Sequence, residues 1–313
     1  MSLLSLICAL ILEQWRPLAE RHALFSPAQR LADHLEAQFN AGQTQHGVIA
    51  WMLAVLPAVI GAWLLYLLCA WISPLLALAF NVGVLYLTMG FRQFSHYFTD
   101  INLALKDDDL ERARELLARW RGSSCAGLSG EEIARLTIEE ALTASHRHVF
   151  GVVFWFVILP GPAGAVLYRL SMYLRRRWGT EAAAELSPVV DRGQFGRFAR
   201  DAFMVLDWMP VRVTAAAFAV VGDFEDAVYC WRNQAASWAD RGLGLVLAAG
   251  AGALGVRLGM PIEHGSEIID RPELGVGEEA DAAMLDSTVG LVWRALVLYL
   301  LLLLLIGIAQ AVR

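Results

Sequence analysis

The sequence contains 44 consecutive residues, from Val48 to Phe91, without a charged side chain. A helix needs about 20 predominantly apolar residues to cross a bilayer, so this stretch is long enough for two crossings. Ser73-Pro74 lies near its middle, and a proline together with the restricted residue before it favours a helix break. The stretch therefore predicts a tight helical hairpin with spans at 48–71 and 75–91.

The composition also indicates a membrane protein. Residues of the set AVILMFWYC make up 57% of the chain and charged residues 18%, against about 25% charged residues in soluble domains. The mean hydropathy is +0.49. These values exclude a disordered chain, a collagen-like chain and an ordinary soluble enzyme. The net charge of −6 indicates no basic face for nucleic acid, so we expect the lipid bilayer as a partner and no nucleic acid.

Two further segments are predicted to span the membrane. Residues 295–312 are uncharged, and the flanking Arg294 and Arg313 can reach the interface with their long side chains. Residues 149–168 are also uncharged, but Pro160-Gly161-Pro162 interrupts them. This interruption leaves open one kinked span or two half-helices. Weaker apolar stretches lie at 3–12, 203–222 and 243–256.

The polar segments 13–47, 92–148 and 170–287 are interpreted as helical, because strand alternation is hard to find in the chain. Ser129 and Glu132 have the spacing of a capping box. We therefore predict an all-α fold, a polytopic helical membrane protein with about four to five spans plus amphipathic and re-entrant helices. We expect a single domain over 1–313. Basic residues crowd two polar segments, and we favour a cytoplasmic position for 92–148.

Several common active-site motifs are absent from the sequence. Lys106 is the only lysine, and neither a GxxxxGK[ST] phosphate loop nor a GxSxG nucleophile motif occurs. The four cysteines are scattered without a CxxC pair, which indicates neither a zinc site nor a disulfide framework. His146 and His148 point in different directions on a helix. No acid-rich motif accompanies them, so we predict no metal site.

Ionisable side chains at membrane depth are candidates for a functional site, because burying them is costly unless they are paired. Asp207 and Arg212 lie inside an apolar segment and are predicted to form a buried ion pair, with each other or with charges such as Arg92 or Glu139. The sequence identifies no catalytic residue. The candidate ligand-site residues are Arg92, His96, Glu139, His146, Arg147, Arg212 and Arg257.

Four segments, in order over most of the chain, resemble the CobD/CbiB superfamily of polytopic membrane proteins, which includes the AmpE-type proteins. They are HYFTDINLALKDDDLERARELLARW (96–120), IEEALTASHRHVFGVVFWFVILPGPAGAVLYRL (138–170), DWMPVRVTA (207–215) and AGALGVRLGMPIEHGSEIIDRPELG (251–275). Synthases of this family make adenosylcobinamide phosphate by ATP-dependent amide formation between adenosylcobyric acid and an aminopropanol-type phosphate. The resemblance implies ATP and Mg²⁺ as cofactors if the chain is an active synthase, and it implies no cofactor otherwise.

The resemblance departs from the synthase pattern ahead of residues 149–168. The family pattern there reads ESxAENTxDG, and Glu139 matches its first Glu. Thr143 and Arg147, however, stand at the positions of acids. Replacing acids by Arg and His disfavours Mg²⁺ and favours an anion. The segment DWMPVR (207–212) is very similar to the AmpE version.

Our first interpretation is therefore an AmpE-like protein with degenerate synthase motifs. AmpE-type proteins are linked to β-lactamase induction and cell-wall stress signalling. Such a protein would bind an anionic small molecule or a partner membrane protein, or form a homo-oligomer, and it would not restore cobalamin synthesis to a strain that lacks its synthase. The alternative is a divergent adenosylcobinamide-phosphate synthase. Both interpretations predict a multi-pass protein of a bacterial-type inner membrane.

Overall fold

The computed structural model describes residues 2–15, 21–40, 44–179, 194–264 and 267–311, which are helical for the most part. The chain forms two compact units. The first contains residues 1–89 and 151–208, and the second contains residues 90–150 and 209–313. The predicted all-α, polytopic membrane fold is confirmed. The single domain over 1–313 stays a prediction.

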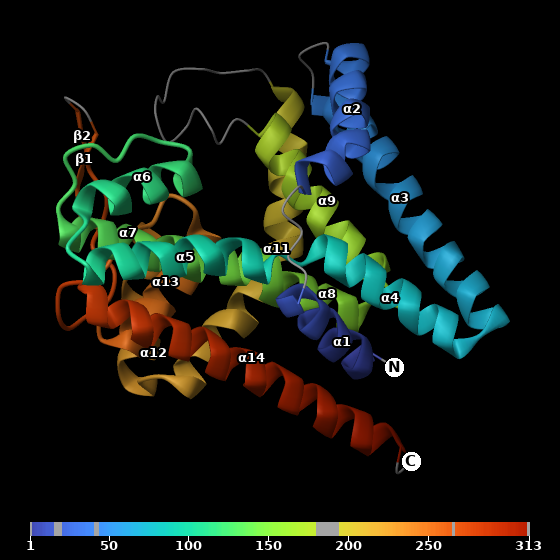
Figure 1. Ribbon diagram of the computed structural model, residues 1–313. Coiled ribbons are helices and arrows are strands. Elements are labelled where there is room, and N and C mark those ends of the chain that lie inside the picture. The colour runs from blue at the N-terminus through green and yellow to red at the C-terminus, as the bar shows by residue number, and fades with distance from the viewer. Residues whose placement is uncertain (1, 16–20, 41–43, 180–193, 265–266, 312–313) are drawn as a thin grey trace. The chain divides into compact units, whose positions relative to one another are not determined.

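The first unit is a set of packed helices (Figure 1). Helix α3 packs on α4 and α9, and α1 packs on α4. The core around these contacts includes Leu35, Val55, Leu174, Trp178 and Phe195. The elements of this unit are α1 (Ser2–Trp15), α2 (Arg21–Phe39), α3 (Thr44–Ile72), α4 (Pro74–Thr88), α8 (Gly151–Ile158), α9 (Ala163–Trp178), the 3₁₀ turn η2 (Gln194–Gly196) and the part of α11 (Arg197–Val221) up to Trp208.

The α3–α4 hairpin turns at Ser73, where the sequence predicted a break. The Oγ atom of Ser73 accepts a hydrogen bond from the Leu75 amide at 3.3 Å. Pro74 occupies the first turn of α4, where the amide hydrogen that proline lacks is not needed. Helix α4 ends at Thr88, earlier than the predicted residue 91, and its 15 residues are fewer than a bilayer crossing requires.

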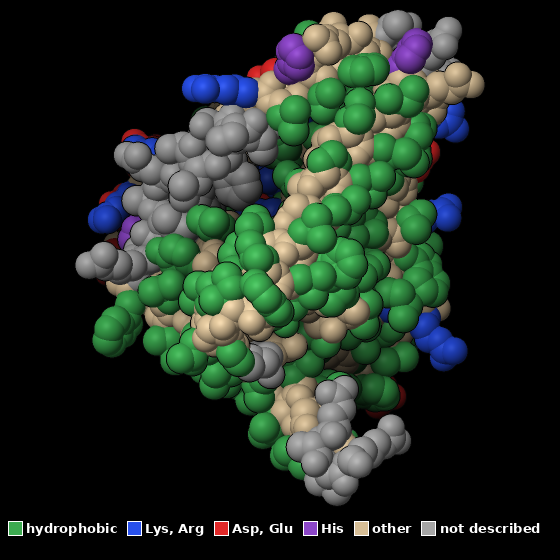
Figure 2. All heavy atoms as spheres, turned by 90° about the vertical axis from the view of Figure 1, so that its right-hand side faces the viewer, with side chains coloured by type: hydrophobic (Ala, Val, Ile, Leu, Met, Phe, Trp, Pro, Cys, Tyr) green, Lys and Arg blue, Asp and Glu red, His purple; other side chains and the backbone are tan. Residues whose placement is uncertain are grey.

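The outer faces of α3 and α4 are apolar, and Figure 2 shows hydrophobic side chains over much of the face that it views. Leu64, Trp71 and Leu75 are 54%, 85% and 76% exposed. Exposed apolar surface on this scale indicates contact with lipid or protein. Four helices in the described part of the chain are long and apolar enough to cross a membrane, namely Thr44–Ile72, Gly130–Ile158, Arg197–Val221 and Ala282–Ala309.

Two of these long helices, Gly130–Ile158 and Arg197–Val221, differ from the predicted spans. The predicted span 149–168 is divided, because α8 ends at Ile158 and α9 begins at Ala163. Of the two alternatives left open, the structure has two helices, and the prolines at 160 and 162 account for the interruption. The weak apolar stretch 203–222 belongs to the 25-residue helix α11, which accommodates Pro210.

The second unit is organised around α7, which packs against α5, α6, α13 and α14. Its core includes Ile101, Leu117, Ile133, Leu136 and Ile262. Strands β1 and β2 form a short antiparallel hairpin in which Ile262 pairs with Ile269. The elements are α5 (Phe91–Lys106), α6 (Leu110–Arg121), α7 (Gly130–Ser145), the π-helical turn η1 (His146–Phe150), the part of α11 from Met209, α12 (Phe224–Asn233), the 3₁₀ turn η3 (Ala235–Ser237), α13 (Arg241–Leu254), β1 (Ile262–His264), β2 (Glu267–Ile269) and α14 (Ala282–Ala311).

Helix α7 begins with the capping box that the sequence predicted. The Glu132 amide donates to Ser129 Oγ at 3.2 Å, and the Ser129 amide donates to Glu132 Oε2 at 2.8 Å. These reciprocal bonds satisfy two amides that have no partner within the helix. The start of α7 is therefore fixed, and with it the direction in which the later residues of α7 point.

Candidate functional site

Helix α7 continues into the π-helical turn η1, which carries the sequence HRHVF. Single π-helical turns are rare and occur frequently at functional sites. His146 is completely buried, and its Nδ1 shares a hydrogen bond with Thr214 Oγ1 at 2.9 Å. The ring of Phe150 packs against Phe218 and Tyr299, with centroids 5.8 and 5.0 Å away. His146 is therefore held in the interior of the second unit.

Arg147 lies on the same turn and is largely buried, with 11% of its side chain exposed. Its Nη2 atom is 3.7 Å from Asp240 Oδ2, which is an ion pair without a hydrogen bond. Asp240 uses Oδ1 to cap α13, where it accepts bonds from the Gly242 and Leu243 amides at 2.9 and 3.2 Å. The buried Nε of Arg147 has no hydrogen-bond partner among the described residues. Arg147 thus has unused donors beside the N-terminus of α13, an arrangement suited to an anion.

Glu139 is buried, at 7% exposure, and both of its carboxylate oxygens are occupied. Arg271 donates from Nη1 to Oε2 at 2.7 Å and from Nη2 to Oε1 at 3.1 Å. The Gly259 amide donates to Oε1 at 2.9 Å. This bidentate pair is the strong geometry for an arginine and a carboxylate. Glu139, which the sequence marked as a site residue, is therefore bound within the protein.

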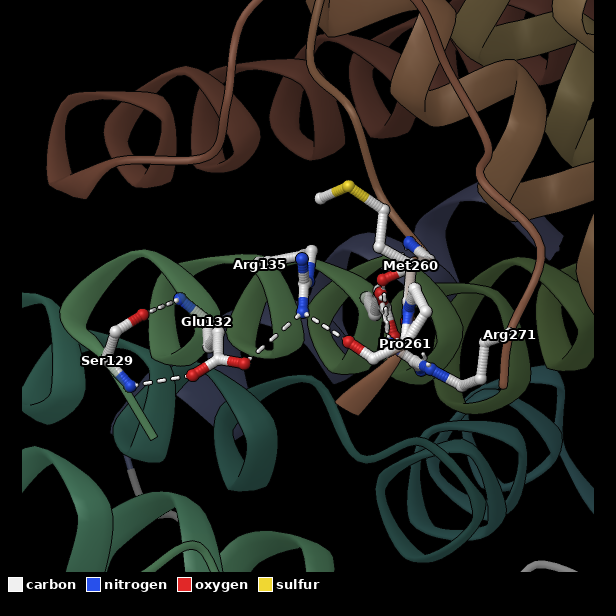
Figure 3. A network of polar contacts seen from close by, with 8 residues as sticks. Ser129, Glu132, Arg135, Met260, Pro261 and Arg271 are labelled. Carbon is white, nitrogen blue, oxygen red and sulfur yellow. Dashed lines mark hydrogen bonds and ion pairs between the residues drawn. The ribbon is translucent and has the colours of Figure 1, made fainter. Parts of the chain in front are cut away.

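The same arginine holds the turn after α13 (Figure 3). Arg271 donates from Nη2 to Gly259 O at 3.0 Å and from Nε to Met260 O at 3.3 Å, and its guanidinium lies 5.4 Å from the centroid of the Trp238 ring. Gly259 and Met260 have φ values of 76° and 63°. A Cβ at position 259 would also collide with the Pro272 carbonyl. The turn requires glycine at 259, and its unfavourable conformation at Met260 is maintained by the surrounding contacts.

The contacts of Glu139 and Arg147 are connected by one short loop. Trp238 lies over Arg271, which binds Glu139, and Asp240, two residues later, faces Arg147. The loop before α13 therefore follows the face of α7 and η1 that carries both predicted residues. We call the surface formed by Glu139, Arg147, Trp238, Asp240 and Arg271 the α7 strip, and we take it as the candidate site.

Two further basic candidates pair with acids outside the α7 strip. Arg257 follows α13 and forms ion pairs with Glu279 at 3.0 Å and with Glu273 at 3.7 Å. The side chain of His96 is 75% exposed and lies 3.7 Å from Asp100 in its own helix. Arg92 is part of α5, but its side chain lies outside the described residues. Glu139 and Arg147 are thus linked through Arg271 and the loop before α13, whereas Arg257 and His96 pair with other acids.

Asp207 belongs to the first unit, where it is buried at 5% exposure. The hydroxyl of Tyr168 donates to Asp207 Oδ1 at 2.9 Å. The Tyr168 ring lies against Gly151, where any Cβ would collide with it. Arg212 is half-buried in the part of α11 that belongs to the second unit. The ion pair of Asp207 and Arg212 stays a prediction.

Sequence reasoning missed Arg271, Trp238 and Tyr168. Arg271 stands 132 positions after Glu139, so no local periodicity connects the two residues. A signal existed in the segment RPELG, which is part of the last stretch that resembles the superfamily and begins with Arg271. Tyr168 lies in the resembling stretch 138–170, but it reads as an ordinary aromatic core residue, and so does Trp238, which lies outside the four stretches.

Comparison with known proteins assigns the chain to a family. The sequence profile described as "CobD/Cbib protein" matches residues 6–292. The chain belongs to the CobD/Cbib family. A protein named cobalamin biosynthesis protein CobD from Stutzerimonas stutzeri is 36% identical over 310 residues, which cover 96% of both chains. Another CobD, from Chromobacterium violaceum, is 34% identical over 253 residues, which cover 81% of this chain and 77% of the relative.

A more distant relative is named CbiB instead of CobD. The cobalamin biosynthesis protein CbiB from Salmonella arizonae is 24% identical over 258 residues, which cover 80% of this chain and 77% of the relative. No solved structure matches the chain. The family and the four long apolar helices together support a membrane protein. The names of these relatives favour the cobalamin alternative over the AmpE-like interpretation.

The α7 strip can be tested for the ATP and Mg²⁺ that a synthase implies. Arg147 supplies a buried cation with unused donors, which suits the phosphate oxygens of a nucleotide. The oxygens of Glu139 are already bonded to Arg271 and Gly259. Within the described residues, no group of three His, Cys, Asp or Glu side chains could hold a metal ion. The donor set therefore fits an anion and does not fit a magnesium ion held by the protein alone.

Proposed function

We propose that this CobD/Cbib protein acts in cobalamin biosynthesis, as an amide-forming enzyme of the adenosylcobinamide-phosphate synthase type. The observation that carries the proposal is the 36% identity over 96% of both chains to a relative named cobalamin biosynthesis protein CobD. The matched region contains the whole α7 strip. The proposed substrates are a corrinoid carboxylic acid and an aminoalkyl phosphate, and both carry anionic groups.

The proposed contribution of the α7 strip is to bind and orient these anionic groups. Arg147 has unused donors close to the start of α13, where the helix dipole also favours negative charge. Glu139 and Arg271 hold the adjoining turn rigid, which supports a fixed geometry for bound groups. The fit to anions supports the proposal. Because both oxygens of Glu139 already accept hydrogen bonds, we assign no metal-binding role to this carboxylate.

A second candidate function is the AmpE-like one, in which the scaffold binds an anion or a partner without forming an amide. The observation that favours it is the sequence at 143–148, where Thr143 and Arg147 replace acids of the synthase pattern. Loss of one well-placed electrostatic group typically reduces an enzymatic rate by about 10²–10³-fold. The two candidate functions therefore predict opposite results in a complementation experiment.

We also propose that the protein is a multi-pass protein of the bacterial inner membrane. The four long apolar helices support this location. Membrane fractions washed with carbonate should retain the protein, and reporter fusions placed after Thr88 and Trp178 should map its topology. Release of the protein by carbonate as a soluble, monodisperse species would contradict the proposal.

The decisive experiment is complementation of a bacterial strain that lacks its adenosylcobinamide-phosphate synthase. We expect the chain to restore growth that depends on cobalamin synthesis, and Glu139→Ala to abolish it. The control Glu115→Ala changes an acid whose side chain is 68% exposed and should leave growth intact. If the unmodified chain is present in the membrane and growth returns only when cobinamide is added, the synthase proposal is wrong and the AmpE-like function is favoured.

A further inference from the structure

Arg135 is a buried arginine whose donors are largely unused. It lies one turn before Glu139 on α7 and is 7% exposed. Its Nη2 donates to the Pro261 carbonyl at 3.4 Å, and the same atom is 3.9 Å from Glu132 Oε1. Its Nε is buried without a hydrogen-bond partner among the described residues. A buried guanidinium in this state is costly unless something else satisfies it.

The three acids whose charges act on Arg135, namely Glu132, Glu139 and Glu279, are engaged by other partners, and Glu279 pairs with Arg257 at 3.0 Å. Glu132, three residues earlier, is part of the capping box, where its Oε2 accepts from the Ser129 amide at 2.8 Å. Glu139, four residues later, is bound bidentately by Arg271. Figure 3 shows Ser129, Glu132 and Arg135 in sequence along α7, with Arg135 directed towards Pro261. Among the described residues, Arg135 therefore has no carboxylate within hydrogen-bonding distance, whereas Arg271 has Glu139.

Arg135 lies just below the molecular surface. Pro261 is exposed, Met260 is half-buried, and 27% of the Glu132 side chain is exposed. The turn beside Arg135 is fixed, because Arg271 holds the carbonyls of Gly259 and Met260. The partly exposed Glu132 side chain borders the guanidinium, and its movement would open a path for a small ligand group without a change in the turn.

We propose that Arg135 forms an anion subsite that binds a phosphate group. The planar guanidinium presents several donors in a geometry that matches phosphate oxygens. The phosphate can belong to a soluble alkyl phosphate or to a lipid headgroup, and both present the same oxygens. This proposal rests on the proposed function only for the choice of an alkyl phosphate as probe. The subsite itself is argued from the contacts of Arg135 and assumes no reaction.

The test is thermal unfolding of the full-length, detergent-solubilised protein with increasing n-propyl phosphate, against sodium chloride at equal ionic strength. A second arm uses short-chain phosphatidylglycerol in place of propyl phosphate. A ligand at free concentration L that binds the folded state stabilises it by RT ln(1 + L/Kd), so Tm rises with ligand concentration and the dependence gives Kd. We expect one of the two phosphates to raise Tm, and Arg135→Gln to raise the Kd for that phosphate by about tenfold or more. The control Arg119→Gln alters an arginine whose side chain is 67% exposed and should leave the Kd for phosphate unchanged.

Glu132→Gln supplies a result of the opposite sign. Glutamine keeps the capping box but removes the carboxylate charge near Arg135, so this variant should bind phosphate more tightly than the unmodified protein. An Arg135 with a merely structural role would show no such gain. The proposal is overturned if neither phosphate raises Tm, if Arg135→Gln responds like the unmodified protein, or if Glu132→Gln binds no more tightly. If phosphate binding depends on Arg135 while complementation fails, the subsite stands and the synthase function falls.

Discussion

Asp207 in the first unit and Glu139 in the second are buried acids, and the donors that bond them in the structure differ in charge. In the first unit, Asp207 accepts a hydrogen bond from the neutral phenol of Tyr168. In the second unit, Glu139 is bound by the guanidinium of Arg271 and by a backbone amide. Removing a neutral donor leaves a carboxylate with fewer bonds, whereas removing a guanidinium leaves an uncompensated charge. The energy of breaking each arrangement therefore distinguishes the two units.

The largest effect is expected for Arg271→Met in the second unit. Methionine retains apolar contact with Trp238 but leaves Glu139 buried without its cation, which typically destabilises by about 3–5 kcal/mol. The measurement is thermal or denaturant unfolding of the detergent-solubilised protein. Arg119→Met removes an exposed ion pair at 3.3 Å and should cost at most about 1 kcal/mol. Equal losses in the two variants would contradict the importance assigned to the buried pair.

The sequence identified more of the fold than of the site, and Glu139 illustrates why. The capping box at Ser129 and Glu132 was predicted because both residues lie within one turn. The break at Ser73 was predicted for the same local reason. Arg271, in contrast, reaches Glu139 through the turn after α13, whose left-handed residues Gly259 and Met260 have no local pattern. Contacts between distant segments depend on packing that periodicity does not encode.

A moderate effect is expected for Tyr168→Phe in the first unit. The change removes the hydroxyl that donates to Asp207 and retains the ring, so we expect a loss of about 1–3 kcal/mol. Tyr173→Phe, a matched change at a half-buried position of the same helix, should cost less than about 0.5 kcal/mol. A loss for Tyr168→Phe as large as that for Arg271→Met would remove the distinction between the two units.

The apolar segment around Asp207 shows the same limit of sequence reasoning. Its position identified Asp207 as buried, and the structure confirms the burial at 5% exposure. The partner was sought among charged residues, because a lone carboxylate in an apolar segment suggests an ion pair. A tyrosine on α9 supplies one hydrogen bond to Asp207, and the ion pair with Arg212 stays a prediction. Neutral donors are common in sequences and carry no signal until the helices are placed.

The smallest effect concerns pH and Cys230 in the second unit. Burial, with a smaller contribution from Asp226, raises the pKa of the Cys230 thiol from 9.0 to about 11. The unfolded thiol loses its proton first, so the folded protein should lose stability as the pH rises from about 9 towards 11. Tm measured across this range should fall less steeply in Cys230→Ala than in the unmodified protein. Identical slopes would show that the buried thiol does not contribute.

The contact between Gly151 and Tyr168 has a consequence for how this protein can evolve. The Tyr168 ring fills the volume that a side chain at 151 would need. An alanine at 151 is therefore acceptable only after residue 168 becomes smaller, and the smaller residue would no longer reach Asp207. The order of substitutions is thus constrained, and the three positions should change together across diverging lineages. In a sufficiently deep alignment, positions 151, 168 and 207 are expected to covary.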